Sequence, residues 1–330
     1  MMAYGARALA TPNIAVVKYW GKRDEALMLP TNSSLSFTMD EQLKTVTDVR
    51  FDPGLKATEL TLDGRELSGK EMEGINKVFS YLRGKYDVRL NAKIDSKNYF
   101  PTAAGMASSA SGYAALAFAL NAALKLDLDG RELSILARLG SGSASRSIYG
   151  GFVEWRKGSK EDGSDCFAKQ VADEDHWPEI RNVVAIVDAE KKKVSSREGM
   201  RATVKTSQLF KERLRRMDRV VSEMKRAVLA RDFEAFARLT MAESNSLHSV
   251  MADTRPSIVY LNDVSRRIIE GVGVLNSKSV LAAYTFDAGP NAHLYTLEAN
   301  VPAVKRMLAG IKGVKQLIVS RVGSGPRLLG

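Results

Sequence analysis

The stretch at residues 99–120 constrains the fold of this chain most strongly, because a glycine- and serine-rich loop runs directly into an alanine-rich helix. The first turn of a helix leaves about four backbone N–H groups without partners and carries a partial positive charge, which stabilises an anion there. Gly105 allows close approach of the backbone, and the hydroxyls of Ser108, Ser109 and Ser111 can cap the helix or bind phosphate oxygens or their metal ion. The stretch predicts a phosphate site; an ordinary capped core helix is the alternative.

Neither of two common nucleotide-binding motifs, the Walker A motif and the dinucleotide fingerprint, is found in this chain. No Gly-Lys-Ser or Gly-Lys-Thr triplet follows Gly105, so this loop is not a Walker A motif, and any catalytic lysine must come from another segment or be absent. The pair Gly140-x-Gly142 resembles a dinucleotide fingerprint only faintly. A predicted helix precedes it where that fingerprint requires a strand, so this interpretation fails.

Length and composition indicate a two-domain globular protein. The chain has 330 residues, of which 45% are hydrophobic and 26% are charged. No stretch approaches the roughly 20 continuous apolar residues of a membrane span, and the N-terminus has no signal-peptide core. We therefore expect a cytoplasmic protein without a membrane partner.

The net charge of +11 calls for a physical explanation. The basic residues are spread along predicted helices with acidic residues between them, and the chain has no RNA- or DNA-binding motif. A small polyanionic substrate explains a locally basic cleft equally well, and most of the excess is predicted to be solvated surface. We expect no nucleic-acid partner.

Cations gather at the end of the first predicted strand. Apolar residues predict a strand at residues 14–19 and a second strand of the same hairpin at residues 35–39, joined by a long polar connection. Lys18, Tyr19, Lys22 and Arg23 lie at the end of the first strand and the start of that connection. Three cations and a hydroxyl so close together suit an anion, although an exposed lysine-rich turn has the same composition.

Hydrophobic periodicity and turn signals predict the remaining elements. Strands are expected within 44–67 and at 87–95, 182–190, 281–287, 292–298 and 315–322. Helices are expected at 70–85, after the phosphate loop, up to Gly140, from Ser207 for some two dozen residues, and at 233–250, 256–272 and 301–312. A polar connection at 157–179 separates the two halves, so the predicted domains are 1–182 and 183–330.

Two further residues are candidates for binding or catalysis. Arg146 lies among four serines at a predicted helix start, where it could pair with a carboxylate or phosphate; a surface arginine is the alternative. Asp287 ends a predicted strand before a Gly-Pro turn, where it could project into a cleft or cap the turn. The three histidines have no ligand spacing and are assigned no metal role.

Seven blocks in the same order give the chain a resemblance to one family over nearly its whole length. It resembles the diphosphomevalonate decarboxylases of the galactokinase, homoserine kinase, mevalonate kinase and phosphomevalonate kinase (GHMP) superfamily. The blocks are NIAVVKYWGKRDE (13–25), NSSLSFT (32–38), NYFPTAAGMASSASGYAAL (98–116), GSGSASRSIYGGFVEW (140–155), KKVSSREGM (192–200), DTRPSIVYLN (253–262) and FDAGPN (286–291).

The resemblance implies an α/β (α+β) fold of two domains. The first would be ribosomal protein S5 domain 2-like and the second a ferredoxin-like α/β domain, with the active site in the cleft between them. It also implies a homodimer and an ATP-dependent decarboxylation of mevalonate 5-diphosphate to isopentenyl diphosphate, ADP, phosphate and carbon dioxide. ATP would lie along the loop and helix at 101–111, with Mg²⁺ held mainly by the nucleotide.

Site residues follow from the same resemblance. Asp287 would act as base or orienter at the substrate's 3-hydroxyl, Lys18 as its cationic neighbour, and Arg146 as the holder of the C1 carboxylate. The other residues matching substrate contacts are Tyr19, Lys22, Ser141, Ser143, Ser196 and Arg197. The residues matching contacts to the ATP phosphates are Pro101, Ala104, Gly105, Ser108 and Ser109.

Related activities remain as alternatives. Similar proteins decarboxylate mevalonate 5-phosphate or mevalonate 3,5-bisphosphate, one branch phosphorylates the 3-position without decarboxylation, and a non-catalytic member would share the fold. Lys22, Ser196 and Arg197 favour a diphosphate, whereas Asp287 with Arg146 favours a complete decarboxylase.

Overall fold

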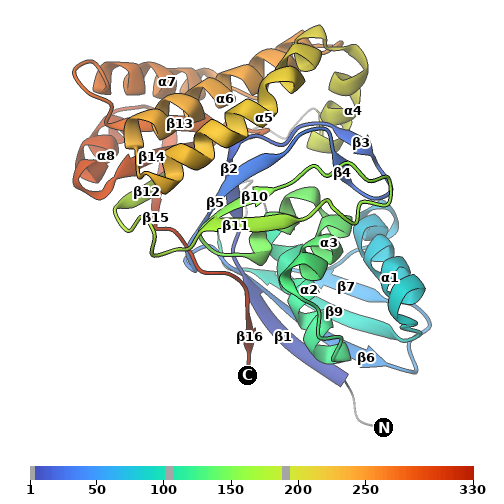
Figure 1. Ribbon diagram of the computed structural model, residues 1–330. Helices are drawn as coiled ribbons and strands as arrows, with labels where there is room; N and C mark the ends of the chain where they lie inside the picture. Colours follow the sequence, from blue (N-terminus) through green and yellow to red (C-terminus); the bar gives the residue numbers. More distant parts are fainter. Residues whose placement is uncertain (1–3, 101–107, 188–193) are drawn as a thin grey trace.

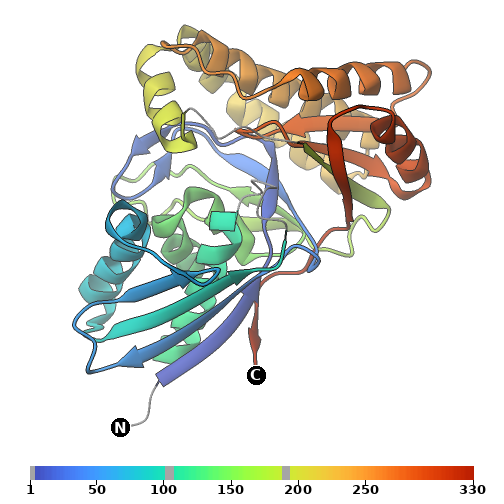
Figure 2. The same ribbon diagram turned by 180° about the vertical axis from the view of Figure 1, so that it is seen from behind.

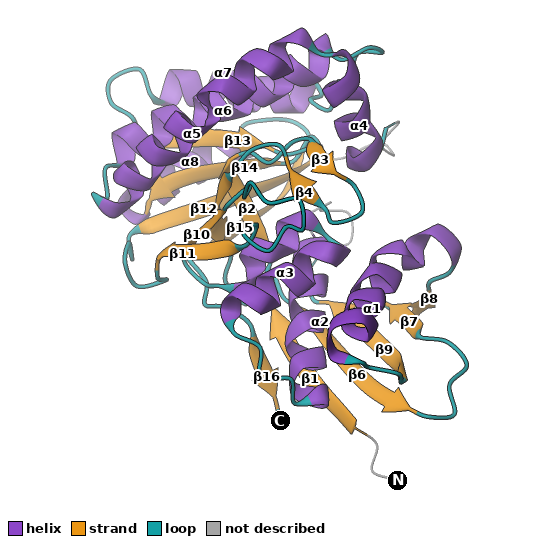
Figure 3. Ribbon diagram, turned by 45° about the vertical axis from the view of Figure 1, so that its right-hand side comes forward, coloured by secondary structure: helices purple, strands orange, loops and turns teal. Residues whose placement is uncertain are grey.

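The computed structural model describes residues 4–100, 108–187 and 194–330 of the chain, and Figure 1 shows their arrangement. The described strands form a six-stranded sheet, two four-stranded sheets and a two-stranded hairpin. Helices and strands are both substantial, as the predicted mixed α/β fold requires (Figure 3). No helix within the described ranges is both long and apolar enough to cross a membrane.

The six-stranded sheet and its three helices form the first half of the molecule (Figure 2). The strands, in spatial order, are β16 (Arg327–Leu329), β1 (Tyr4–Ala10), β6 (Thr45–Asp52), β9 (Asn91–Asn98), β7 (Glu59–Leu62) and β8 (Arg65–Glu66). The helices are α1 (Glu73–Tyr86), preceded by the 3₁₀ turn η1 (Gly69–Met72), then α2 (Ser108–Leu124) and α3 (Gly130–Gly140). Because β16 pairs with β1, the end of the chain returns to the sheet in which it began.

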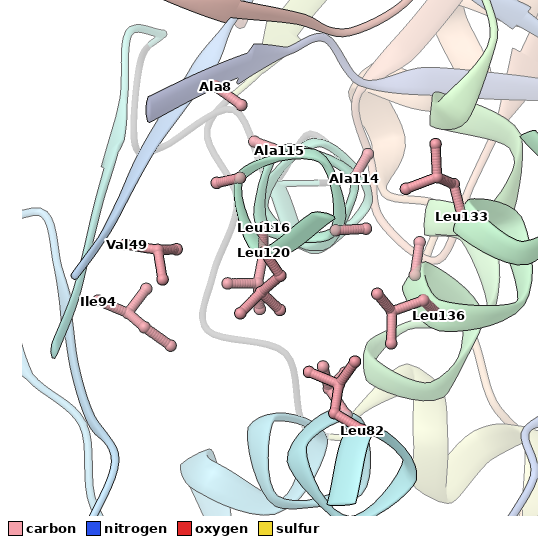
Figure 4. Packing of buried hydrophobic residues seen from close by; sticks show 14 of the residues in the cluster. Ala8, Val49, Leu82, Ile94, Ala114, Ala115, Leu116, Leu120, Leu133 and Leu136 are labelled. Atoms are coloured by element: carbon pink, nitrogen blue, oxygen red, sulfur yellow. The ribbon is translucent and has the colours of Figure 1, made fainter. Parts of the chain in front are cut away.

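The alanine-rich helix α2 lies against β1 and β6 at the centre of this half. Ala114 and Ala115 are fully buried, and their small side chains let the helix approach the sheet closely. Leu82 of α1 and Leu136 of α3 complete the same hydrophobic cluster (Figure 4). The sequence prediction of a thin helix packed on a sheet is therefore confirmed for α2.

The first four-stranded sheet is a buried layer between the two halves. Its order is β11 (Ala168–Ala172), β10 (Phe152–Trp155), β5 (Ser34–Thr38) and β2 (Asn13–Val17), and every residue of β2 and β5 is buried. The predicted hairpin is present, since β2 and β5 pair antiparallel. Its connection carries the small hairpin of β3 (Lys22–Asp24) and β4 (Leu29–Pro30). The 3₁₀ helix η3 (Gly142–Ile148) contacts this sheet, as do helices α5 and α6 of the second half.

The second four-stranded sheet forms the second half with the remaining helices. Its order is β13 (Ala282–Phe286), β14 (Ala292–Leu297), β12 (Ile180–Val187) and β15 (Val314–Ser320). Alternation along β12 sends Val184 toward α5 (Gln208–Leu229) and α6 (Phe233–Asp253). It sends Val183 and Ala185 toward α7 (Asp263–Leu275) and α8 (Val301–Ala309), which follows the short turn η4 (Glu298–Asn300).

Several element boundaries differ from the predicted ones, among them those of β2, β9 (Asn91–Asn98) and α7. The strand predicted at 14–19 ends at Val17, so the two residues after it lie beyond the sheet, and the apolar run before it forms a separate strand, β1. The strand predicted at 87–95 begins only at Asn91. The helix predicted at 256–272 begins at Asp263, because the Asn262 side chain accepts a hydrogen bond from the backbone N–H of Ser265 and caps the helix there.

One helix was not predicted. Helix α4 (Ser196–Thr206) begins with a capping box, in which the Ser195 hydroxyl accepts from the backbone N–H of Glu198 and the Glu198 carboxylate accepts from the backbone N–H of Ser195. The Ser-x-x-Glu spacing that signals such a start is visible in the sequence. Ser196 and Arg197 are predicted above only as substrate contacts, so the helix that they begin is missed.

Candidate active site

A cavity of about 470 Å³ lies where the buried middle sheet meets both halves of the molecule. Its wall comes from chain segments far apart in the sequence: the end of β2, the start of α2, the helix η3, the start of α4 and the turn after β13. Ten of the predicted site residues line it, namely Lys18, Tyr19, Lys22, Ser109, Ser141, Ser143, Arg146, Ser196, Arg197 and Asp287. Ser108 begins α2 but does not line the cavity. Pro101, Ala104 and Gly105 lie outside the described residues.

The inner charged group consists of Lys18, Asp287 and Arg146. Lys18 Nζ lies 2.6 Å from Asp287 Oδ1, although the two residues are 269 positions apart in the chain. The lysine side chain is 2% exposed and the aspartate side chain is 47% exposed, so the carboxylate keeps an open side toward the cavity. Both residues line the cavity, and the aspartate presents the larger exposed surface to a ligand.

Electrostatics lower the pKa of both members of this pair. Burial raises the pKa of Asp287. The charge and hydrogen bond of Lys18 and the charge of Arg146 lower that pKa by a larger amount, so the net shift is downward. Burial lowers the pKa of Lys18, and the charge of Asp287 opposes this shift. An ionised carboxylate with an open side can accept a proton or a hydrogen bond from a hydroxyl group.

Arg146 is a buried residue of η3 rather than a surface arginine, since only 3% of it is exposed. Its Nε donates to Asn13 Oδ1 at 2.9 Å, and its Nη1 donates to Ser34 Oγ at 2.6 Å. Burial lowers the pKa of Arg146 to about 10, which leaves the guanidinium charged at neutral pH. Two bonds from β2 and β5 thus fix a cation that lines the cavity.

Asn13 is a site residue that sequence reasoning missed. Besides accepting from Arg146, it donates from Nδ2 to the Ser147 hydroxyl at 2.8 Å and to the Ser143 carbonyl at 3.0 Å. It also lines the cavity. A single asparagine at the start of an apolar strand carries no signal of its own, so only the fold reveals it.

His293 of β14 also lines the cavity, close enough to Asp287 and Lys18 to interact with both charges. Burial lowers the pKa of His293 to about 4, so the ring is neutral at neutral pH. The Asn182 side-chain amide lies 3.2 Å from its Nδ1. Among the described residues, no group of three or more His, Cys, Asp or Glu side chains is arranged to hold a metal ion.

The outer charged group consists of Lys22, Glu25, Glu73, Arg197 and Arg201. Lys22 Nζ lies 2.7 Å from Glu25, which also pairs with Arg201 at 3.3 Å, and Arg197 pairs with Glu73 at 3.5 Å. Apart from the buried Lys22 side chain, the members of this group are 42–52% exposed. Its cations are therefore partnered by carboxylates at the rim of the cavity.

Two helix N-termini provide further anion-binding groups. The first turn of α2 brings Ser109 to the cavity, where its hydroxyl lies 3.2 Å from that of Ser141, and Ser141 lies 3.3 Å from Ser143. The first turn of α4 brings Ser196 and Arg197 to the same cavity. Hydroxyls, free backbone N–H groups and helix dipoles are the groups that bind phosphate in proteins.

Tyr19 supplies a buried hydroxyl whose hydrogen-bond partner is not found among the described residues. Its ring packs edge-on against Trp155, with centroids 4.9 Å apart and planes at 71°. Burial raises the pKa of Tyr19, so the phenol stays protonated and can donate a hydrogen bond. An unpaired buried donor beside a cavity fits a polar ligand.

Comparisons with known proteins agree with this architecture. Residues 10–168 match the model of the diphosphomevalonate decarboxylase-like N-terminal domain, and residues 182–312 match that of the mevalonate 5-diphosphate decarboxylase C-terminal domain. The chain is 41% identical to a diphosphomevalonate decarboxylase of Ganoderma lucidum, in an alignment that covers 100% of the chain and 97% of that protein.

Two solved structures extend the likeness to three dimensions. Mevalonate diphosphate decarboxylase from Staphylococcus aureus superposes with a TM-score of 0.93 at 36% identity, covering 100% of this chain and 99% of the other. A structure of MDDEF in complex with MVAPP, AMPPCP and magnesium superposes with a TM-score of 0.92 at 35% identity, covering 99% of each chain.

Proposed function

The chain belongs to the diphosphomevalonate decarboxylase family, and on that premise we propose that it converts mevalonate 5-diphosphate and ATP to isopentenyl diphosphate, ADP, phosphate and carbon dioxide. The observation that carries the proposal is the inner charged group: one carboxylate, one ammonium and one guanidinium line a single cavity. Each of these three charges has a task in the reaction.

The first task is to turn the 3-hydroxyl of the substrate into a leaving group. Hydroxide leaves poorly, so that oxygen must first attack the terminal phosphorus of ATP, breaking the bond to ADP. The open side of Asp287 would orient the hydroxyl and accept its proton. Lys18, held 2.6 Å from this carboxylate, would keep Asp287 ionised and stabilise the transferred phosphoryl oxygens.

The second task is the loss of carbon dioxide. Departure of the 3-phosphate leaves electron-poor character at C3, and the electron pair of the C1–C2 bond then forms the new double bond as carbon dioxide departs. Arg146 would hold the C1 carboxylate in line for this step. Its bonds to Asn13 and Ser34 support the role, because they limit the movement of the guanidinium.

The remaining groups would bind the two phosphate-bearing molecules. Tyr19, Ser196 and the cations of the outer charged group suit the 5-diphosphate. Ser141 and Ser143 would add hydroxyls from η3. For ATP, we propose the first turn of α2 with Ser108 and Ser109, together with Pro101, Ala104 and Gly105, which lie outside the described residues.

Mg²⁺ would accompany the nucleotide rather than occupy a site built by the protein. No acidic or histidine cluster suited to a metal occurs in the described part of the chain, whereas hydroxyls and a helix N-terminus fit nucleotide phosphates well. The ion would neutralise negative charge on the phosphates as the phosphoryl group moves. The MDDEF complex with AMPPCP and magnesium supports this assignment.

Product analysis tests the proposed reaction. Purified protein is incubated with ATP, Mg²⁺ and each of three substrates: mevalonate 5-phosphate, mevalonate 5-diphosphate and mevalonate 3,5-bisphosphate. We expect equal amounts of ADP, phosphate and carbon dioxide from the diphosphate, and none without ATP. Preference for the monophosphate, turnover without ATP, or phosphorylation without carbon dioxide release would each replace the proposal with one of the related activities.

Three further properties are part of the proposal. We propose domains at 1–182 and 183–330, with the boundary near the start of β12, which spans Ile180–Val187 and belongs to the second four-stranded sheet. We propose a cytoplasmic location, which cell fractionation would test. We propose a homodimer without nucleic-acid partners, on the family resemblance, which light scattering and a salt-titrated gel shift would test.

A further inference from the structure

We propose that a buried ion pair between Arg213 and Glu243 positions Lys18 by holding both of its backbone polar groups. Arg213 belongs to α5 and Glu243 to α6, both in the second half of the molecule, whereas Lys18 follows β2 of the middle sheet. Neither helix residue lines the cavity, so the two are positioning residues that act through Lys18. The inference rests on the proposed function, because it assigns Lys18 a part in that reaction.

The backbone of Lys18 needs partners from outside its own sheet. Strand β2 ends at Val17, which is the last residue paired with β5. Lys18 is nevertheless buried, and a buried backbone group without a hydrogen bond is costly. Its N–H donates to Glu243 Oε2 at 3.0 Å, and its carbonyl accepts from Arg213 Nη2 at 3.1 Å and from Asn32 Nδ2 at 3.0 Å. One ion pair thus binds both sides of a single residue.

The ion pair itself is rigid. Arg213 Nη1 donates to Glu243 Oε1 at 2.9 Å, and Arg213 Nη2 donates to Glu243 Oε2 at 2.8 Å, which is the parallel two-bond geometry of the strongest arginine–carboxylate pairs. The two side chains are 1% and 5% exposed. Because neither can reach water without disturbing the packing of α5 against α6, the pair has little freedom to move.

Stability alone gives a weak reason for such a pair. Removing two charges from water costs free energy, and apolar residues of similar volume often replace buried ion pairs without loss of stability. Arg213 Nε, moreover, is buried without a partner among the described residues. Apolar side chains could not, however, bind an N–H and a carbonyl of Lys18 at once. The placement of Lys18 therefore gives the pair a role that packing does not supply.

Helix α6 also holds the strand that carries Asp287. The hydroxyl of Ser244, the residue after Glu243, accepts a hydrogen bond from the backbone N–H of Phe286 at 3.1 Å. Phe286 immediately precedes Asp287. Consecutive residues of one helix thus contact the backbone at Lys18 and the backbone beside Asp287. This helix sets the spacing between two side chains that come from opposite ends of the chain.

Kinetics of isosteric variants provide the first test. Glu243→Gln preserves shape but weakens the bonds to Lys18 and Arg213, and a misplacement of about 1 Å near the reacting groups can cost about 10²-fold in rate. We expect kcat to fall by about ten- to a hundredfold, with KM for both substrates changed by less than about threefold. Arg213→Lys keeps a donor and is expected to lose less activity than Arg213→Met.

A matched control separates positioning from general damage. Glu154 of β10 pairs with Lys225 of α5 at 2.9 Å, so Glu154→Gln removes a partly buried ion pair of the same helix that touches neither Lys18 nor the cavity. We expect its kcat to stay within about twofold of the unmodified protein. Equal losses of kcat in Glu154→Gln and Glu243→Gln would overturn the inference.

A double-mutant cycle provides the decisive test. In a Lys18→Met background, where no ammonium remains to be positioned, Glu243→Gln is expected to lower the residual single-turnover rate by less than about twofold. The same fold loss in both backgrounds, or no loss in the unmodified background, would overturn the proposal. Thermal unfolding of every variant is measured alongside. If Glu243→Gln does not fold, Arg213→Lys is combined with Lys18→Met in its place. Equal fold losses in both backgrounds, or no loss in the unmodified background, would then overturn the proposal.

The unmodified protein distinguishes this inference from the proposed function. Turnover of mevalonate 5-diphosphate by the unmodified protein, combined with additive effects in the cycle, would remove the positioning role and leave the proposed reaction intact. Absence of any turnover by the unmodified protein would overturn the proposed reaction, and the inference with it.

Discussion

All of the inner charged group lines the cavity, whereas only Lys22 and Arg197 of the outer charged group do, and the two groups are constructed differently. The inner group joins side chains from β2, η3 and the turn after β13, and its two cations are at most 3% exposed. The outer group gathers around the β3–β4 hairpin and the first turn of α4, where most of its side chains are 42–52% exposed. Buried charges hold one geometry because no solvent can replace their partners, whereas exposed charges can exchange partners at little cost.

This contrast indicates that the two groups have different functions. The inner group has the fixed geometry that a reaction requires, and we assign it to the transfer of the phosphoryl group and the loss of carbon dioxide. The outer group has cations whose carboxylate partners a diphosphate can replace, and we assign it to binding. Substitutions in the inner group should therefore change kcat, and substitutions in the outer group should change KM.

The largest effect is expected for Asp287→Asn. The amide keeps the size of the carboxylate but cannot accept the hydroxyl proton, so kcat should fall by about 10²- to 10⁴-fold while substrate binding stays nearly intact. Steady-state kinetics and a binding titration measure the two quantities. A variant with nearly normal kcat would exclude Asp287 from the reaction and remove the functional distinction between the two groups.

The next effect concerns pH. Lys18 lowers the pKa of Asp287. The kcat of the unmodified protein should therefore stay constant as the pH falls, until the pH is close to or below the ordinary aspartate pKa of about 3.9. Lys18→Met removes that charge and leaves the burial, which raises the pKa. The acid limb of the kcat–pH profile should therefore move to higher pH, and the plateau value of kcat should also fall. An unchanged acid limb would show that Lys18 does not control the ionisation of Asp287.

A smaller effect is expected in the outer group. Arg197→Ala removes one charged hydrogen-bond donor at the rim and should raise KM for mevalonate 5-diphosphate about tenfold, with kcat changed by less than about twofold. Lys157→Ala is a matched control, because Lys157 pairs with Asp218 on the surface and does not line the cavity. If only KM for ATP rose, Arg197 would belong to the nucleotide site.

The smallest effect is the response to salt. Exposed charges are screened within a Debye length of about 10 Å at 0.1 M ionic strength, and buried charges are screened much less. Raising the ionic strength from about 0.05 to 0.5 M should therefore raise KM for the diphosphate severalfold and leave kcat nearly constant. A comparable fall in kcat would indicate that the inner group is more exposed to solvent in solution than its burial implies.

The sequence predicted local structure well where a local signal exists. The alanine-rich helix, the β2–β5 hairpin and the helix that begins after Ser207 all have periodicity or capping residues that act within a few positions. Helix α4 was missed although its Ser-x-x-Glu capping signal is present. The segment was considered only for residues that could bind substrate, and its capping signal was overlooked.

The sequence could not predict the packing of single side chains around the cavity. Asn13 has no distinguishing neighbour in the chain, yet it fixes Arg146 from 133 positions away. Arg213 and Glu243 look like ordinary members of charged helices, and only the packing of α5 and α6 buries them behind Lys18. Burial and partner choice at these positions depend on segments that approach one another only in the folded chain.

By itself, the sequence determined most of the secondary structure, the family resemblance and the residue types available for chemistry, because hydrophobic periodicity, caps and motifs act over short distances. Only the tertiary structure decided which charges became buried partners and which remained at the rim, since the pKa and freedom of a charged group depend on its surroundings in space. Lys18 and Asp287, 269 positions apart, become one ion pair for this reason.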